Sequence, residues 1–182
     1  MNPKEVNKTI GSKLRGDELI EVFRSGIDEM SMLTNALYVS QELLYCHNIT
    51  DFSVDGYRVV RLSDITDIVT CDKNESLRFM NYIYKKENLF PKDYSILESK
   101  SWSAVCKYLA GAKKAATVEC TFDDAIDYYV GWIESVNGNI ATMKCFDGGG
   151  TLFEQNQRIN LDFVSQIIFD DKYSRLMAKY IK

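Results

Sequence analysis

Apolar and polar residues alternate along short segments in two parts of the chain, and a period of two is typical of half-buried β-strands. In the first part the expected strands lie in ELIEVFRS, SMLTNALYV, ELLYCHN and twice within VVRLSDITDIVTCD. In the second part they lie in ATVECTFD, YYVGWIESV, IATMKCF and twice within RINLDFVSQIIFDD. Each part therefore predicts about five strands, the last two separated by a tight turn.

The two parts also align with each other without a gap, residues 27–77 over residues 126–176, at an offset of 99. Identical residues are few, but the spacing of apolar residues is shared. The matched pairs include Cys46/Cys145, Val60/Ile159, Leu62/Leu161, Ile65/Val164 and Ile68/Ile167. The alignment predicts a duplicated unit, and the alternative is a chance likeness between two strand-rich segments.

A helix is expected at the end of each part. In the first, Asp72 and Glu75 have the spacing of a capping box, followed by an apolar stripe of Leu77, Met80, Ile83 and Tyr84. In the second, Asp171 is the expected N-cap, and Leu176, Met177 and Tyr180 form the expected apolar stripe. Both helices should pack these stripes against their strands.

Between the two parts, a further helix is expected from Ser101, with Trp102, Val105, Cys106 and Leu109 on one face and Gly111 near its end. In the second part, Asn137-Gly138 is the strongest hairpin signal of the chain, because both central residues of a type I′ turn have positive φ. The strands on either side of this dipeptide should be neighbours.

Five short antiparallel strands in about sixty residues favour a closed barrel, because closure removes the exposed edges of a small sheet. The ending INLDFVSQIIFDDKYSRL resembles that of bacterial proteins of undefined role that carry tandem SH3-like or Sm-like β-barrel repeats. The resemblance covers residues 126–182 and, through the alignment, residues 27–84. The glycine and asparagine with which Sm proteins bind RNA have no counterpart in VVRLSDIT or RINLDFVS.

The expected fold is mainly β with α (α+β): two tandem five-stranded SH3-like or Sm-like barrels, each followed by a short helix. The expected organisation is a flexible N-terminus at 1–16, a first barrel with its helix at 17–84, a helical connector at 85–114, and a second barrel with its helix at 115–182.

Composition narrows the classes of function. The net charge is −4 and the pI is near 5.1, which disfavours nucleic acid as a partner because phosphate contacts dominate that affinity. The sequence shows neither a signal peptide nor a run of apolar residues long enough for a membrane span, so a cytoplasmic protein without membrane contact is expected. The five cysteines form no C-x-x-C pair and are expected to be buried thiols.

The segment Asp147-Gly148-Gly149-Gly150-Thr151 is the first candidate for chemistry, because it resembles the phosphate loop of the actin and heat-shock ATPase superfamily. In that interpretation Asp147 orients a metal or water and Thr151 touches phosphate. Only 31 residues follow Thr151, too few for the second phosphate loop and the adenosine loop of that fold. A connecting loop is therefore the favoured interpretation.

The other titratable residues give weaker indications of a catalytic or metal site. His47 is the only histidine, and a structural position is favoured over a catalytic one. Asp123, Asp124 and Asp127 form an acidic cluster without the spacing of an EF-hand, and capping explains Asp171. We assign no catalytic residue, no metal and no cofactor.

The aromatic residues give the remaining hypothesis. Tyr128, Tyr129 and Trp132 occupy both faces of one expected strand, so at least one ring faces solvent or a partner. The alternative is burial of these rings between strands and helix. The sequence thus predicts a non-catalytic module that binds a protein or peptide. An Sm-like nucleic-acid-binding protein and a nucleotide-binding enzyme using the Asp147 loop are the first and second alternatives.

Overall fold

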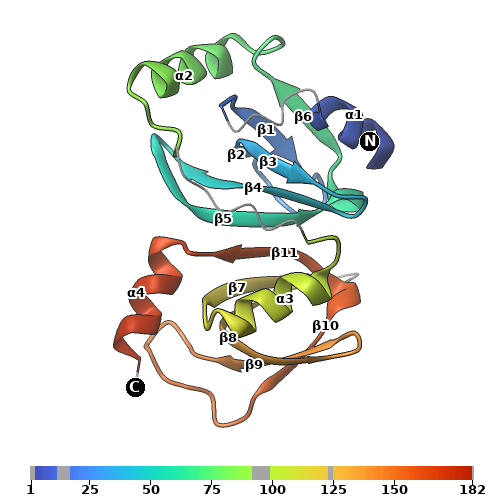
Figure 1. Ribbon diagram of the computed structural model, residues 1–182, viewed down its shortest axis with the longest axis vertical. Helices are drawn as coiled ribbons and strands as arrows, with labels where there is room; N and C mark the ends of the chain where they lie inside the picture. The colour runs from blue at the N-terminus through green and yellow to red at the C-terminus, as the bar shows by residue number, and fades with distance from the viewer. Residues whose placement is uncertain (1–2, 12–16, 92–98, 123–124, 182) are drawn as a thin grey trace. The chain divides into compact units, whose positions relative to one another are not determined.

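The computed structural model describes residues 3–11, 17–91, 99–122 and 125–181, and the chain divides into two compact units, Met1–Glu98 and Ser99–Lys182 (Figure 1). Unit 1 consists of α1 (Pro3–Gly11), β1 (Ile20–Phe23), β2 (Met32–Thr34), β3 (Ala36–Val39), β4 (Leu43–Thr50), β5 (Ser53–Arg61), the 3₁₀ turn η1 (Leu62–Asp64), β6 (Asp67–Thr70) and α2 (Glu75–Lys86). Unit 2 consists of α3 (Trp102–Gly111), β7 (Ala115–Thr121), β8 (Ile126–Asn137), β9 (Ile140–Cys145), β10 (Gln157–Asn160), the 3₁₀ turn η2 (Leu161–Phe163), β11 (Val164–Phe169) and α4 (Lys172–Tyr180).

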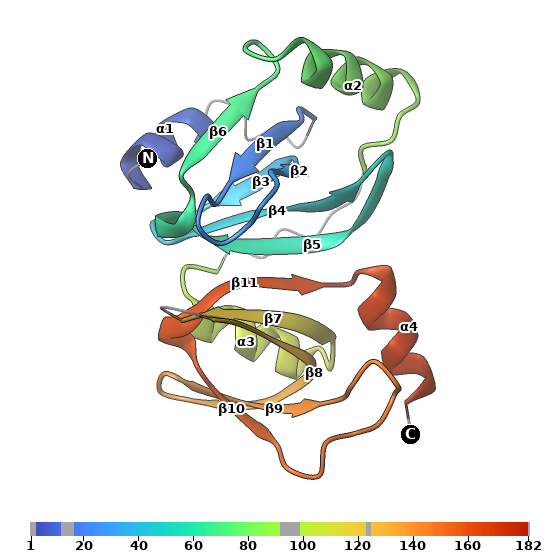
Figure 2. The same cartoon turned by 180° about the vertical axis from the view of Figure 1, so that it is seen from behind.

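The strands of unit 2 follow one another antiparallel in the order β10-β9-β8-β7-β11 (Figure 2). β10 and β11 stand at the two ends of this order and do not pair with each other. The predicted closed barrel is therefore wrong for unit 2. Closure would need β10 to pair with β11, and among the residues that the structure describes the four-residue β10 pairs with β9 alone.

In unit 1 the strands divide into two groups, β2-β1-β6 and β3-β4-β5, again antiparallel. The segment expected as a single strand over SMLTNALYV is split into β2 and β3 at Asn35, whose side chain is fully buried. The described part of this unit therefore has six strands, and these also do not close into a barrel.

The offset of 99 reappears in the order of elements. η1 at Leu62–Asp64 and η2 at Leu161–Phe163 are separated by that number, and each precedes the last strand and helix of its unit. The matched apolar pairs of the alignment are all buried: Cys46/Cys145, Val60/Ile159, Leu62/Leu161, Ile65/Val164 and Ile68/Ile167. The tight turn expected between the last two strands is confirmed in both units.

The hairpin signal in unit 2 is confirmed with a shift of one residue. β8 and β9 are neighbours, and Asn137 pairs with Ile140, so the central residues of the turn are Gly138 and Asn139. Gly138 has φ +57° and supplies the positive φ that a two-residue loop requires.

Two of the three expected helix starts are confirmed. Ser101 caps α3 by accepting from the Ala104 N–H, and Asp171 caps α4 by accepting from the Ser174 N–H at 3.1 Å. The capping box at Asp72 is wrong. The N-cap of α2 is Asn74, which accepts from the Leu77 N–H at 3.1 Å, while Asp72 accepts from the Thr70 hydroxyl.

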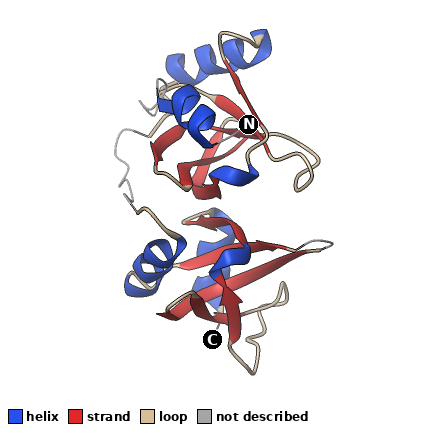
Figure 3. Cartoon of the chain, turned by 90° about the vertical axis from the view of Figure 1, so that its right-hand side faces the viewer, coloured by secondary structure: helices blue, strands red, loops and turns tan. Residues whose placement is uncertain are grey.

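Helices pack on strands in both units; Figure 3 draws the helices in blue and the strands in red. α3 packs against β8 and buries the expected face of Trp102, Val105, Cys106 and Leu109. α2 buries Leu77 and Tyr84 in a cluster with Leu19, Ile49 and Cys71. Residues 3–11, in a segment for which the sequence predicted flexibility, form α1, and its Val6 and Ile10 are fully buried.

Candidate partner-binding surface

The three aromatic residues singled out on β8 do not form one surface. Side chains alternate across a strand, so Tyr128 and Trp132 share one face and Tyr129 lies on the other. The Tyr128 side chain is 60% exposed, whereas Tyr129 and Trp132 are half-buried. The Trp132 ring lies 5.4 Å from the Phe146 ring, centroid to centroid. The role of these three residues in binding a partner stays a prediction.

A larger exposed apolar group lies on α4. Tyr173, Leu176 and Tyr180 are 48%, 47% and 71% exposed, and their spacing of three and four places them in one stripe along the helix. The expectation that Leu176 and Tyr180 pack against the strands is therefore wrong. The side of α4 toward β7 carries the buried Ser174 and the half-buried Met177 and Ala178 instead.

Basic side chains accompany this stripe. At about 100° per residue, Lys172, Arg175 and Lys179 form a row along one side of it, and all three are exposed. The helix contains no acidic residue. The Lys179 ammonium also lies 5.3 Å from the centroid of the Tyr180 ring. We call Tyr173, Leu176 and Tyr180 with this basic row the α4 face.

The corresponding helix of unit 1 has a face of the same kind. Phe79 and Tyr82 of α2 are 64% and 56% exposed. Lys86 lies on the same outer side as the two rings, opposite the buried Leu77 and Tyr84. The exposed Arg78 and Lys85 lie on the flank of the helix, and the Arg78 Nε donates to the Cys71 carbonyl at 3.2 Å. We call Phe79, Tyr82 and these three basic residues the α2 face.

Sequence reasoning missed both faces because an apolar residue at helical spacing was taken to point toward the core. One signal could have identified the α4 face. Its apolar stripe adjoins a continuous basic row, while the opposite side of the helix offers only Ser174, Met177 and Ala178. The larger apolar side chains therefore lie beside the charges, which belong in water.

The Asp147 loop closes on itself. The Asp147 carboxylate accepts through Oδ1 from the N–H groups of Gly149 and Thr151, both at 2.9 Å, and the Gly150 N–H bonds the Asp147 carbonyl at 3.0 Å. Gly150 supplies the positive φ of the turn, +81°. The two N–H groups that a phosphate would need are thus already bonded to a carboxylate, which also repels an anion.

For this reason we expect ATP with Mg²⁺ to leave the melting temperature of the protein unchanged. Differential scanning fluorimetry of the wild type and of Gly149→Val, with and without ATP and Mg²⁺, measures this directly. A rise in melting temperature with nucleotide in the wild type, lost in Gly149→Val, would show that the loop opens to bind phosphate and would contradict the closed geometry.

His47 takes part in a buried hydrogen-bond pair. Its Nδ1 lies 2.8 Å from Oδ1 of Asn35, and both side chains are buried. Because a carbonyl oxygen only accepts, the hydrogen bond requires the proton of His47 to lie on Nδ1. Burial lowers the pKa of His47 from 6.5 to about 4, so the ring is neutral near pH 7. The ring thereby connects strand β4 to the junction of β2 and β3.

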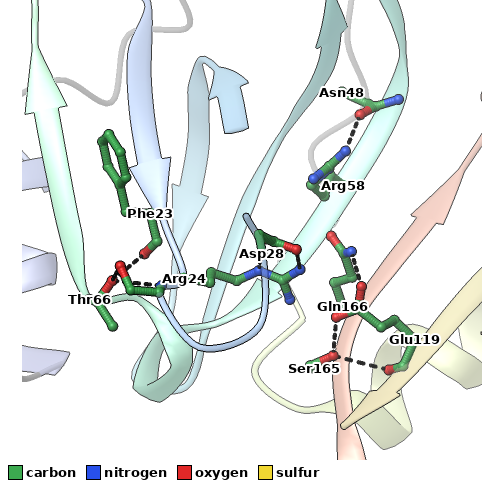
Figure 4. A network of polar contacts seen from close by, with 10 residues as sticks. Phe23, Arg24, Asp28, Asn48, Arg58, Thr66, Glu119, Ser165 and Gln166 are labelled. Atoms are coloured by element: carbon green, nitrogen blue, oxygen red, sulfur yellow. Dashed lines mark hydrogen bonds and ion pairs between the residues drawn. The ribbon is translucent and has the colours of Figure 1, made fainter. Parts of the chain in front are cut away.

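Other buried polar side chains form hydrogen bonds or ion pairs within their own unit (Figure 4). In unit 1 the fully buried Arg24 forms a bidentate ion pair with Asp28, both N···O distances 2.7 Å. In unit 2 the buried Glu119 on β7 accepts hydrogen bonds from Ser165 and Gln166 on β11. These groups hold a loop and a strand pair in place.

The five cysteines are free, and all are buried as expected. Burial raises the pKa of Cys106 to about 12 and that of Cys145 to about 11, so both thiols stay protonated. The residues that the structure describes hold no group of three or more His, Cys, Asp or Glu side chains suited to a metal ion. Asp123 and Asp124 of the acidic cluster lie outside the described residues.

Comparison with known protein families, with curated proteins and with solved structures finds no match to this chain. Of the helices in the described residues, none is long and apolar enough to cross a lipid bilayer. The functional conclusion therefore rests on the residues themselves.

Proposed function

We propose that this protein is a non-catalytic module that binds a partner protein through exposed aromatic side chains. The observation that supports it is the pairing of exposed rings with basic side chains on the last helix of each unit, at Phe79 and Tyr82 and again at Tyr173 and Tyr180. Tyrosine and arginine are enriched among the residues that contribute most of the binding energy in protein interfaces. Contact with a partner would also remove the apolar area of these rings from water.

The environment of the polar groups supports the same proposal. His47, Arg24, Glu119 and Asp147 each engage in hydrogen bonds that hold their own unit together. A catalytic base or nucleophile instead has to reach a substrate from an open site. The exposed faces of α2 and α4 offer contact area.

Affinity purification from the source cells, with quantitative mass spectrometry, tests the proposal. The comparison is between the wild type, the ring-to-serine variant Phe79→Ser/Tyr82→Ser/Tyr173→Ser/Tyr180→Ser, and the control Phe153→Ser. Phe153 is 40% exposed and lies on neither face. We expect a small set of proteins retained by the wild type and the control and lost by the four-site variant. Equal recovery with all three baits, or no protein above background, would contradict the proposal.

A further inference from the structure

We propose that the α4 face is a docking site for an acidic segment of a partner protein, a segment that places apolar side chains between its carboxylates. This inference rests on the proposed function and adds the surface and the chemistry of the partner. Three observations carry it: the apolar stripe, the basic row beside it, and the distribution of charge over the chain.

The stripe is a suitable contact area because its side chains are held on one side of a capped helix. α4 has nine residues, so Tyr173, Leu176 and Tyr180 extend over about 10 Å along its axis. The cap by Asp171 and the packing of α4 against β7 fix the helix, and the three side chains project away from that contact. Leu176 between the rings of Tyr173 and Tyr180 forms a contact area long enough for the apolar side chains of a helical peptide of two turns.

The basic row sets the sign of the partner. α4 contains three basic residues and no acidic one, and α2 contains three basic residues and one acidic one. The whole chain has 22 basic and 26 acidic residues, so subtracting these two helices leaves 16 basic against 25 acidic. The two helices carry net +5 on a chain whose remainder carries −9. A partner segment complementary to the α4 face is therefore acidic.

The α2 face repeats this chemistry in the other unit. Phe79 and Tyr82 are exposed as Tyr173 and Tyr180 are, with Lys86 on the same side and Arg78 and Lys85 on the adjoining flank, where Arg78 bonds the Cys71 carbonyl. The two helices differ in sequence but share exposed rings next to basic residues. We infer that this combination is what a partner would contact.

Nucleic acid also combines negative charge with groups that stack on rings, and the α4 face supplies the local basic surface that the nucleic-acid alternative requires. Two features favour the acidic protein segment. Leu176, which offers no ring for base stacking, lies at the centre of the stripe. The remaining charge of −9 repels a phosphate chain that extends beyond α4, whereas a short peptide contacts α4 alone.

Fluorescence anisotropy with defined probes tests the inference on the full chain. The probe is a labelled amphipathic peptide of about twelve residues, with leucines at helical spacing and glutamates elsewhere. Three matched competitors separate the contributions: the same peptide with lysine for glutamate, the same peptide with serine for leucine, and a single-stranded RNA of similar length. We expect the Glu/Leu peptide to bind at least about tenfold more tightly than each of the three, a difference of about 1.4 kcal/mol.

Variants locate the binding. Tyr173→Ser/Tyr180→Ser and Arg175→Glu/Lys179→Glu should each weaken the Glu/Leu peptide at least about tenfold. The matched controls are Tyr128→Ser/Tyr129→Ser, which removes the two tyrosine rings of β8, and Lys100→Glu/Lys107→Glu, which makes the same charge change at exposed lysines before and within α3. Both controls should bind the peptide as the wild type does. An unchanged urea midpoint, read by tryptophan fluorescence, verifies that each variant is folded.

The outcomes separate this inference from the proposed function. Preference for RNA over the Glu/Leu peptide, or no binding of the peptide, overturns the acidic-segment inference. Loss of binding in Tyr128→Ser/Tyr129→Ser with none in the α4 variants moves the docking site to β8 and overturns it as well. The proposed function fails separately, when affinity purification with the wild-type chain retains no specific protein.

Discussion

Replacing Gly131 by alanine is expected to destabilise unit 2 by about 3 to 4 kcal/mol, the largest effect of any single methyl group that we predict. Gly131 lies in β8 where the strand pairs on both sides, with Ala116 of β7 and with Cys145 of β9. A Cβ at this position would lie 2.0 Å from the Lys144 carbonyl oxygen and 2.8 Å from the Cys145 Cα. Both are backbone atoms, so the strands themselves would have to separate.

Urea unfolding followed by tryptophan fluorescence measures this effect in the correct unit, because the only two tryptophans, Trp102 and Trp132, both lie in unit 2. Gly148→Ala is the matched control, since a Cβ there has no atom within 4 Å. We expect the control to stay within about 0.5 kcal/mol of the wild type. A loss of less than about 1 kcal/mol in Gly131→Ala would contradict the close approach of β8 and β9.

Lowering the pH from 7 to 4 is expected to destabilise unit 1 through His47. The pKa of this ring is about 4 in the folded protein and near 6.5 in the unfolded chain. Between these values the unfolded chain binds a proton that the folded protein does not. The contribution of the neutral His47 to the free energy of unfolding is therefore fully present above pH 6.5. It is lost as the pH falls toward 4, and the loss is at most about 3 kcal/mol.

The histidine can be followed without assignment of other residues, because it is the only one in the chain. In a proton NMR titration its ring resonances should stay at their neutral positions down to about pH 5. His47→Asn removes the titrating group and keeps a donor for Asn35. Urea unfolding by far-UV circular dichroism should show less acid destabilisation in this variant than in the wild type. A ring that titrates near pH 6.5 would show that His47 is solvated and would contradict the buried pair.

The sequence predicted local features because each depends on a few adjacent residues. Asn137-Gly138 indicated the β8–β9 hairpin, and Ser101 and Asp171 indicated helix starts, since a turn needs positive φ and a helix start needs an acceptor for its free N–H groups. The shared apolar spacing of the two parts likewise identified residues that are buried in both units.

Features that depend on distant contacts were not predictable in the same way. Closure of a barrel requires pairing between the two strands at opposite ends of the sheet order, β10 and β11 in unit 2. The period of two specifies a strand without specifying its neighbour. The break between β2 and β3 at Asn35 depends on the contact with His47, twelve residues away. The α4 face was assigned to the core because spacing alone does not distinguish the buried side of a helix from an exposed one.

Hydrogen–deuterium exchange of the full chain with and without the Glu/Leu peptide tests the central claim most directly. We predict slower exchange in residues 172–180 on addition of the peptide, with residues 126–132 and 43–50 unchanged. Protection confined to residues 126–132, or absent from residues 172–180 at saturating peptide, would contradict the assignment of the α4 face as the binding surface.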